Sequence, residues 1–415
     1  MKIAVIGAGI IGVTTAYELA LDGHEVTVFE RRGAAAEESS FAVAGIIAPG
    51  YISPWAAPGM ALKIARHLFA KHSAVRFSLP LSGGDLAWMW KCWRACKQST
   101  YVRNRARLLR LASYSRERLN HIGTELELEY DRSSGFLVLL RTARDHAMML
   151  RGLKVLRDAQ MAFRELAPEE ARKIEPSLSP DTALHSAIHL PGDDVGNCRQ
   201  FALLLKNVAL AKGVSFAFNT LVEGIDPSDG MSLRIAGESS RCRFDAAVMC
   251  AGVDSARLLR PLGLKIPLAA VHGYSVSAPV REAINAPRSA VMDERYKVAI
   301  TRLGNRVRVS GGAELGGHAD KQHKMALQTL YQVLQDWFPG AANRSSGVQV
   351  WKGARPMLPD GPPLLGASGV AGLWLNLGHG SSGWALSCGS ARAVADLIGG
   401  RAPGVDLEGF GVGRL

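Results

Sequence analysis

Short apolar runs alternate with stretches of helical spacing at the start of the chain. Residues 2–6 form a β-branched apolar run, which is typical of a buried parallel strand. Residues 13–21 have apolar positions at helical spacing, and a second apolar run occupies residues 25–29. This order predicts a strand–helix–strand unit at the N-terminus.

The turn between the first predicted strand and helix has the spacing Gly7-x-Gly9-x-x-Gly12. In such a unit the first glycine permits a tight turn, the second lets backbone approach a pyrophosphate, and the third lets helix and strand pack closely. The phosphates would lie at the helix N-terminus. Glu30 follows the second strand, where an acid that accepts hydrogen bonds from a ribose is expected. We therefore predict a dinucleotide site.

Glu30 also indicates which dinucleotide is bound. Arg31 and Arg32 follow it and suggest a 2′-phosphate, but the Glu30 carboxylate would repel one. NADP is therefore disfavoured. The alternative to any dinucleotide is a glycine-rich turn without a ligand.

The next part of the chain changes from small residues to helical patterns. Small residues dominate 33–50, which suits a backbone that lies against a flat ligand, and a proline-punctuated loop follows at 51–59. Residues 63 to about 122 have helical patterns. A strand is predicted at 136–140, and an amphipathic helix follows to about residue 160.

A short strand, a turn and a helix are predicted at 185–190, 191–194 and 198–212. The apolar runs at 214–218 and 221–225 are expected to be strands that rejoin the nucleotide-binding sheet. The strand 244–250 ends at Ala251-Gly252, where small residues would let the backbone approach the same dinucleotide. Cys250 is expected to be a core residue.

The pattern of apolar residues in the C-terminal half predicts a mixed sheet with one helix packed on its back. Its strands are expected at 274–277, 297–302 and 306–309, and its helix at 321–338. Residues 351–361 have the composition of a Gly/Pro-rich turn that presents Arg355. A strand at 373–377 runs into Gly378-His379-Gly380-Ser381-Ser382 and then a helix, which is a second strand–turn–helix cradle. It is no hydrolase elbow, because no G-x-S-x-G occurs there.

Three separated glycine-rich turns indicate a large cofactor held by both ends of the chain. FAD fits this better than NAD, which one N-terminal βαβ region usually satisfies.

Composition indicates a globular protein of 415 residues with two domains or one large composite domain. Its six cysteines are scattered, so free thiols and a reducing compartment are expected. The chain starts directly in a strand, and no run approaches the ~18 apolar residues of a membrane span, so a cytoplasmic protein is expected. His185 and His189 lie four apart without a third ligand nearby, so no metal site is expected.

The formal net charge of +12 is concentrated between residues 91 and 118, where nine bases face the single acid Glu117. Trp88, Trp90 and Trp93 adjoin these bases. Basic residues with interfacial aromatics suit a helix on anionic lipid. The alternative is a solvated basic face with tryptophans in the core. Nucleic acid is not expected, since no recognition module accompanies the charge.

Several motifs resemble the D-amino-acid dehydrogenase small subunit family, within the FAD-dependent D-amino-acid/glycine/sarcosine oxidase superfamily. The resemblance runs nearly end to end, and the Pro49–Gly59 stretch is specific to the dehydrogenases. Its carriers are the N-terminal fingerprint, Ser40–Gly45, Pro49–Gly59, Gly273–Ser275, Tyr296–Arg302, Arg355–Met357 with Pro359–Gly361, and Leu373–Trp384.

The resemblance implies an α/β fold with a Rossmann-type, glutathione-reductase-like FAD-binding domain. A discontinuous substrate domain would be built on a mixed or antiparallel sheet plus helices. The implied FAD-binding segments are 1–60, 165–260 and 346–415; the implied substrate or cap segments are 61–164, which holds the basic helical region, and 261–345.

The implied activity is oxidation of D-amino acids to 2-oxo acids and ammonia, with electrons passed to a quinone or other acceptor. The implied enzyme is cytoplasmic, often peripheral on the inner face of the membrane. No cysteine follows the Gly-x-Arg turn, so noncovalent FAD is expected. The residues expected to contact FAD are Gly7, Gly9, Ile10, Ile11, Gly12, Glu30, Arg31, Ser39, Ser40, Ala44, Gly45, Ile46, Val222, Cys250, Ala251, Gly252, Arg355, Gly378, His379, Gly380, Ser381 and Ser382.

Four side chains are the candidates for substrate chemistry. A guanidinium can clamp a carboxylate through two hydrogen bonds, and Arg355 is the candidate. Tyr274 would donate a second hydrogen bond to that carboxylate, and Tyr51 and His379 would orient the amine or the flavin edge. The alternatives are an oxygen-using amine or glycine-type oxidase of the same fold, and a non-catalytic flavoprotein subunit.

Three positions depart from the family pattern. Val43 stands in place of Asn, Ala48 in place of Ser, and His272 in place of Lys. The first two remove polar groups expected near the flavin. Substrate preference and electron acceptor therefore stay open at this point.

Overall fold

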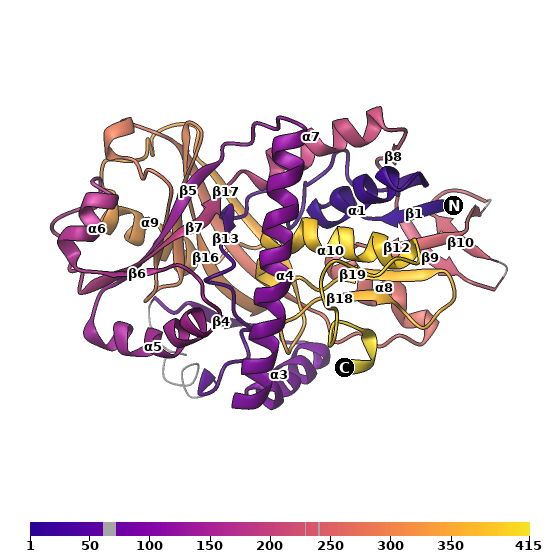
Figure 1. Ribbon diagram of the computed structural model, residues 1–415, viewed down its shortest axis with the longest axis horizontal. Coiled ribbons are helices and arrows are strands. Elements are labelled where there is room, and N and C mark those ends of the chain that lie inside the picture. Colours follow the sequence, from indigo (N-terminus) through magenta and orange to yellow (C-terminus); the bar gives the residue numbers. More distant parts are fainter. Residues whose placement is uncertain (61–71, 229, 240) are drawn as a thin grey trace.

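The computed structural model describes residues 1–60, 72–228, 230–239 and 241–415 (Figure 1). Its N-terminus belongs to a six-stranded sheet of order β18-β19-β12-β1-β2-β8. All neighbours in this sheet are parallel except β18 and β19. The strands are β1 (Lys2–Ile6), β2 (Glu25–Phe29), β8 (Ser215–Ala217), β12 (Ala246–Met249), β18 (Leu364–Ala367) and β19 (Leu373–Leu377).

Helices cover this sheet, in line with the mainly apolar residues of its strands. Helix α1 (Ile10–Leu21) packs against α7 (Cys198–Ala211) and α10 (Gly383–Ile398). The predicted strand–helix–strand unit and the second cradle are therefore neighbours in space. This arrangement confirms the predicted Rossmann-type fold class.

A separate three-stranded sheet corrects one expectation. Strand β9 (Val222–Asp226) pairs with β10 (Met231–Ile235), which pairs with β11 (Cys242–Phe244). Of the two strands expected to rejoin the nucleotide-binding sheet, only β8 does so, beside β2. The β9 strand finds its partner in the adjacent hairpin instead.

A ten-stranded mixed sheet occupies the other side of the molecule (Figure 1). Helix α9 (Lys324–Trp337) packs on β13 and β16, as the sequence predicted. The main path is β17 (Gln349–Met357), β13 (Ala269–Pro279), β16 (Arg306–Gly316), β15 (Val298–Leu303), β14 (Ala290–Asp293), β5 (Ser133–Leu140), β7 (Ser186–Val195) and β3 (Ile46–Ile47), with β4 (Val75–Ser78) beside β16 and β6 (Arg164–Leu166) beside β7.

Three predictions fail in this sheet. Arg355 was expected in a turn but lies in β17, whose backbone pairs with β13 from residue 349 to 357. Residues 191–194 were expected to turn, but β7 continues to Val195. Val75–Ser78 was expected to be helical and is a strand. Each segment gains partners from distant strands, which local composition does not show. Part of the predicted helical stretch, residues 63–71, lies outside the described residues.

Helix α4 (Gln98–Glu125) crosses the molecule between the two large sheets, and α3 (Gly83–Ala95) precedes it (Figure 1). Arg118 of α4 donates two hydrogen bonds to the buried carboxylate of Glu18, and Arg110 pairs with Asp406 at 2.9 Å. Several bases of α4 thus bind the rest of the protein. No helix in the described part of the chain is long and apolar enough to cross a bilayer.

The predicted domain boundaries stay a prediction. Strands β3, β7 and β17 lie in segments assigned to the FAD-binding part, yet they pair within the ten-stranded sheet. Segments predicted to belong to the FAD-binding domain therefore contribute strands to the ten-stranded sheet.

Candidate active site

One continuous cavity of about 1980 Å³ is lined by residues of both large sheets. Pockets for a single small molecule usually measure about 300–1,000 Å³. The cavity therefore has room for a large cofactor and a second molecule.

The N-terminal fingerprint forms one end of the cavity. Gly7 has φ 103°, and a Cβ there would lie 2.7 Å from the Cys250 carbonyl oxygen. A Cβ on Gly12 would lie 1.8 Å from the Gly7 carbonyl oxygen, so helix α1 touches the turn as predicted. Gly12 itself does not line the cavity, unlike Gly7 and Gly9. Its role is packing.

The N-terminus of helix α1 and the carboxylate of Glu30 lie at this end of the cavity. The N-cap residue of α1 is Gly9, which has no side chain to cap the helix, and Ser40 Oγ accepts a hydrogen bond from the Ile10 amide at 3.0 Å. The Glu30 carboxylate is held at the cavity by the amides of Ala8 and Arg32, at 2.8 and 2.9 Å. A pyrophosphate and a ribose fit this arrangement.

Arg31 lines the cavity, but its guanidinium is paired with acidic side chains of the protein. Its guanidinium pairs with Glu38 and Asp254. These carboxylates raise the pKa of the Arg31 guanidinium. The arginine therefore braces the cavity wall and leaves no free charge for a 2′-phosphate.

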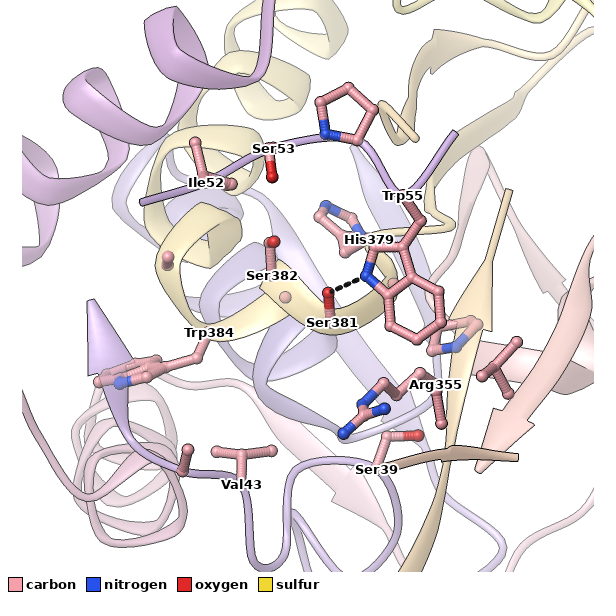
Figure 2. Close-up of a pocket in the computed structure, with 18 of the residues that line it drawn as sticks. Ser39, Val43, Ile52, Ser53, Trp55, Arg355, His379, Ser381, Ser382 and Trp384 are labelled. Atoms are coloured by element: carbon pink, nitrogen blue, oxygen red, sulfur yellow. Dashed lines mark hydrogen bonds between the residues drawn. The ribbon is translucent and has the colours of Figure 1, made fainter. Parts of the chain in front are cut away.

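The second cradle lies where β19 runs into α10. Gly378 and Gly380 have φ of 80° and 58°. The N-cap residue of α10 is Ser382, whose side chain makes no capping hydrogen bond (Figure 2). Backbone amides of two helix N-termini thus reach the same cavity, which fits an elongated anionic cofactor such as FAD. The predicted FAD contacts that line the cavity are Gly7, Gly9, Ile10, Ile11, Glu30, Arg31, Ser39, Ser40, Ala44, Gly45, Ile46, Val222, Cys250, Ala251, Gly252, Arg355, Gly378, His379, Gly380, Ser381 and Ser382.

The small-residue loop between these cradles is fixed by side chains from distant elements. Trp384 Nε1 donates to the Gly45 carbonyl at 3.1 Å, and Arg308 donates to the Val43 carbonyl at 3.0 Å. Ser39 Oγ donates to the Ala354 carbonyl at 2.6 Å. Sequence reasoning missed Trp384 and Arg308, because nothing local ties them to the loop.

Two of the three departures from the family pattern face the cavity. Val43 and Ala48 line it, so the wall there is apolar as expected. His272 is buried on β13 outside the cavity lining, and burial lowers the pKa of its imidazole.

Arg355 projects into the cavity from β17, near Ser39, Trp55 and Ser381 (Figure 2). Its Nη1 donates to the Gly312 carbonyl at 2.8 Å, and no acid among the described residues pairs with it. Burial without a countercharge lowers the pKa of the guanidinium to about 10, so it stays charged near neutral pH. Gly273 makes room for it, since a Cβ there would lie 2.2 Å from the Arg355 side chain.

Tyr274 is engaged differently from the expectation. Its hydroxyl donates to Glu314 and accepts from the His323 amide at 3.2 Å. Glu314 also pairs with Lys352 at 3.0 Å. Burial and the Glu314 carboxylate raise the pKa of the Tyr274 hydroxyl. Because its one proton is held by Glu314, the hydroxyl does not point a free donor at a substrate carboxylate.

Tyr51 belongs to a charged cluster on the cavity wall. Its hydroxyl donates to Glu294 at 2.7 Å and accepts from Lys297 at 3.1 Å, and Lys297 also pairs with Glu294. Burial raises the pKa of the Tyr51 hydroxyl, so it remains protonated. Sequence reasoning did not assign Glu294 or Lys297 to the site, although Lys297 is the first residue of the expected strand 297–302 and Glu294 lies three residues before it.

His379 is neutral in this environment. It is 4% exposed, and burial lowers the pKa of its imidazole to about 3. Its Nε2 lies 3.0 Å from Ser390 Oγ. An uncharged ring can orient a neighbour by hydrogen bonding but adds no charge to the site.

The described residues hold no group of three or more His, Cys, Asp or Glu side chains placed to bind a metal. Two cysteines of the cavity wall, Cys198 and Cys250, are buried, and burial raises the pKa of both thiols, that of Cys250 to about 12. Neither is a reactive thiolate. The prediction of noncovalent FAD stands as a prediction.

The fold and the two anion cradles define the class of dinucleotide-binding flavoproteins. The chain belongs to the family described as FAD dependent oxidoreductase, whose model matches residues 2–397. It is therefore an FAD-dependent oxidoreductase.

Individual relatives agree with this class. The chain is 42% identical to a protein named D-amino acid dehydrogenase from Cereibacter sphaeroides, over 100% of this chain and 95% of that protein. Glycine oxidase from Geobacillus kaustophilus has the same fold, with a TM-score of 0.76, 23% identity, and coverage of 100% and 99% of the two chains. Iminodiacetate oxidase from Chelativorans sp. BNC1 has a TM-score of 0.75 and 22% identity, over 99% and 98%.

Proposed function

We propose that the protein oxidises D-amino acids to 2-oxo acids and ammonia and passes the electrons to a quinone or another acceptor other than dioxygen. The observation that carries this proposal is the Arg355 guanidinium, which faces the cavity without an acidic partner among the described residues. A partly buried cation without a countercharge is costly, and a substrate carboxylate would supply the missing charge. The relative named D-amino acid dehydrogenase supports the substrate class.

In the proposed reaction FAD, when bound, accepts the hydride that leaves the substrate Cα. Arg355 holds the carboxylate, so that Cα has one orientation in the cavity. The cluster of Tyr51, Glu294 and Lys297 is the polar group proposed to orient the amine, and neutral His379 the flavin edge. Water then hydrolyses the imine product to the 2-oxo acid and ammonia.

Anaerobic mixing of the holoenzyme with D- and L-amino acids tests the proposal. We expect D-amino acids to bleach the flavin and L-amino acids not to. Arg355→Ala should lower kcat/KM about 10- to 150-fold with flavin still bound, as expected for loss of charged hydrogen bonds worth about 1.5–3 kcal/mol. Arg234→Ala, at an exposed arginine of β10, is the control.

The competing functions give different results in the same assay. Hydrogen peroxide formed in air at the rate of substrate oxidation would indicate an oxidase. Failure of every amino acid to bleach the flavin would indicate a non-catalytic flavoprotein. An unchanged KM in Arg355→Ala would place the carboxylate elsewhere.

We further propose that α3 rests on an anionic membrane surface. Trp90 and Trp93 are 53% and 61% exposed beside Lys91 and Arg94, whereas Trp88 is buried and donates to the Met357 carbonyl. Exposed tryptophans among bases suit lipid headgroups. The holoenzyme should float with vesicles containing anionic lipid at low salt, and absence of flotation removes this proposal. The cytoplasmic location stays a prediction.

A further inference from the structure

The cavity extends beyond the flavin and substrate region into a second lobe between α3, α4 and α5 (Ala143–Asp158). We call it the α3–α5 lobe. Its walls are mainly apolar and polarizable side chains, namely Cys92, Trp93, Tyr101, Val102, Met148 and Met149. Neither the two cradles nor Arg355 belong to these three helices.

Three charged side chains of these helices line the cavity, namely Arg105, Arg144 and Asp145. Arg144 is exposed, whereas Arg105 and Asp145 are buried. Arg105 of α4 is 7% exposed and lines the cavity. Its only hydrogen bond within the described residues runs from Nη2 to the Gly152 carbonyl at 3.3 Å, and no acid pairs with it there. The neighbouring Asp145 carboxylate instead caps α5 through Thr142.

The chemistry of the lobe indicates a ligand that is apolar apart from an oxygen acceptor. Buried guanidinium donors need an acceptor, and the surrounding methionines and aromatics favour a flat, polarizable molecule. The rim is apolar too, since Trp93, Val102 and Met148 are 61%, 49% and 46% exposed. A zwitterionic amino acid gains little from such walls, whereas a quinone has both the ring and the carbonyl oxygens.

We infer that the α3–α5 lobe binds a quinone, with Arg105 donating a hydrogen bond to a quinone oxygen. This inference rests on the proposed function, because it locates the acceptor of the electrons removed from the substrate. The quinone takes up two electrons and two protons and leaves as the quinol, and the reduced flavin returns to its oxidised state. Trp93, one of the exposed tryptophans of α3, also lines this lobe.

Arg105→Met tests the inference, with Arg107→Met as the matched control on the same helix, where Arg107 pairs with Glu408 outside the cavity. The holoenzyme is reduced anaerobically with dithionite and mixed with a short-tailed ubiquinone or with ferricyanide. We expect Arg105→Met to slow reoxidation by the ubiquinone about 10-fold or more, and to leave the ferricyanide rate unchanged. Arg107→Met should match the wild type with both oxidants.

Binding gives a second readout that needs no turnover. Ubiquinone should quench the fluorescence of Trp93, and its Kd should rise about 10-fold or more in Arg105→Met. Equal quinone rates and Kd values in both variants would overturn the inference. So would a raised KM for D-amino acids with unchanged quinone reoxidation, because that makes the lobe a substrate pocket. Dithionite reduction keeps these outcomes separate from failure of any amino acid to bleach the flavin, which concerns the proposed function alone.

Discussion

The two ends of the cavity are built from different parts of the polypeptide. At the nucleotide end the site is formed mainly by backbone, through the glycine turn of residues 7–12 and the amides at the N-terminus of α1. At the substrate end the site is formed by side chains, namely Arg355 on β17 and the cluster of Tyr51, Glu294 and Lys297. We expect an added Cβ at Gly12 to disrupt the fold at the nucleotide end. We expect the protein to fold when a side chain of the substrate end is altered.

This difference has a physical origin. A pyrophosphate is the same in every dinucleotide, so a fixed backbone geometry binds it. Substrate recognition depends on placing individual charges, which strands of a rigid sheet can carry one at a time. Substitutions at the two ends should therefore fail in different ways.

The largest effect is expected for Gly12→Ala. The new Cβ would meet the Gly7 carbonyl at 1.8 Å, and both atoms belong to fixed backbone, so α1 must separate from the turn. Overpacking usually costs about 1–3 kcal/mol, and a clash with backbone should exceed this range. We expect little folded, flavin-containing protein, measured by absorbance and by Tm.

Gly9→Ala is the control for that substitution. Its Cβ would lie 3.4 Å from Ser40 Oγ, the nearest heavy atom, so the fold should survive and only flavin affinity should fall. Equal Tm values for Gly12→Ala and Gly9→Ala would contradict the prediction that the close contact between α1 and the Gly7 turn limits stability.

Gly273→Ala should leave the fold intact and damage the substrate end. Its Cβ would lie 2.2 Å from the Arg355 guanidinium, which is the movable end of a long side chain. The guanidinium must shift, and kcat/KM should fall about 10- to 100-fold with full flavin content. Gly413→Ala, where a Cβ would meet no atom within 4 Å and φ is not positive, controls for adding a methyl group at a glycine. A large loss of flavin in Gly273→Ala would contradict the separation of the two ends.

The same contrast explains what the sequence could predict. The fingerprint, Glu30 and the second cradle are local patterns, and the structure brings all of them except Gly12 to the cavity lining. Arg355 was identified, but its strand was not, because pairing with β13 depends on residues eighty positions away. The proton of Tyr274 is held by Glu314, and only the sheet register of β13 and β16 shows this.

The smallest effect is expected from a buried acid behind the substrate end. Asp193 of β7 is 2% exposed and packs against Gly50, next to Tyr51. Burial raises the pKa of its carboxyl to about 7, and Arg116, 3.5 Å away, offsets this only in part. Between its unfolded pKa and about pH 7 the folded chain holds a proton that the unfolded chain has released. This contribution to the free energy of unfolding is therefore full at acid pH and is lost as the pH rises to 7.

Asp193→Asn should remove that pH dependence. Between pH 5.5 and 7 the wild type should lose at most about 2 kcal/mol more stability than the variant, since one pKa unit corresponds to about 1.4 kcal/mol. Urea unfolding of the holoenzyme at both pH values measures the difference, with exposed Asp158→Asn as control. The nucleotide end has no comparable buried acid with a raised pKa among the cavity-lining residues described, so flavin affinity should change little over this range. Equal pH slopes for wild type and Asp193→Asn would mean that Asp193 is ionised in the folded protein, with Arg116 as an adequate partner.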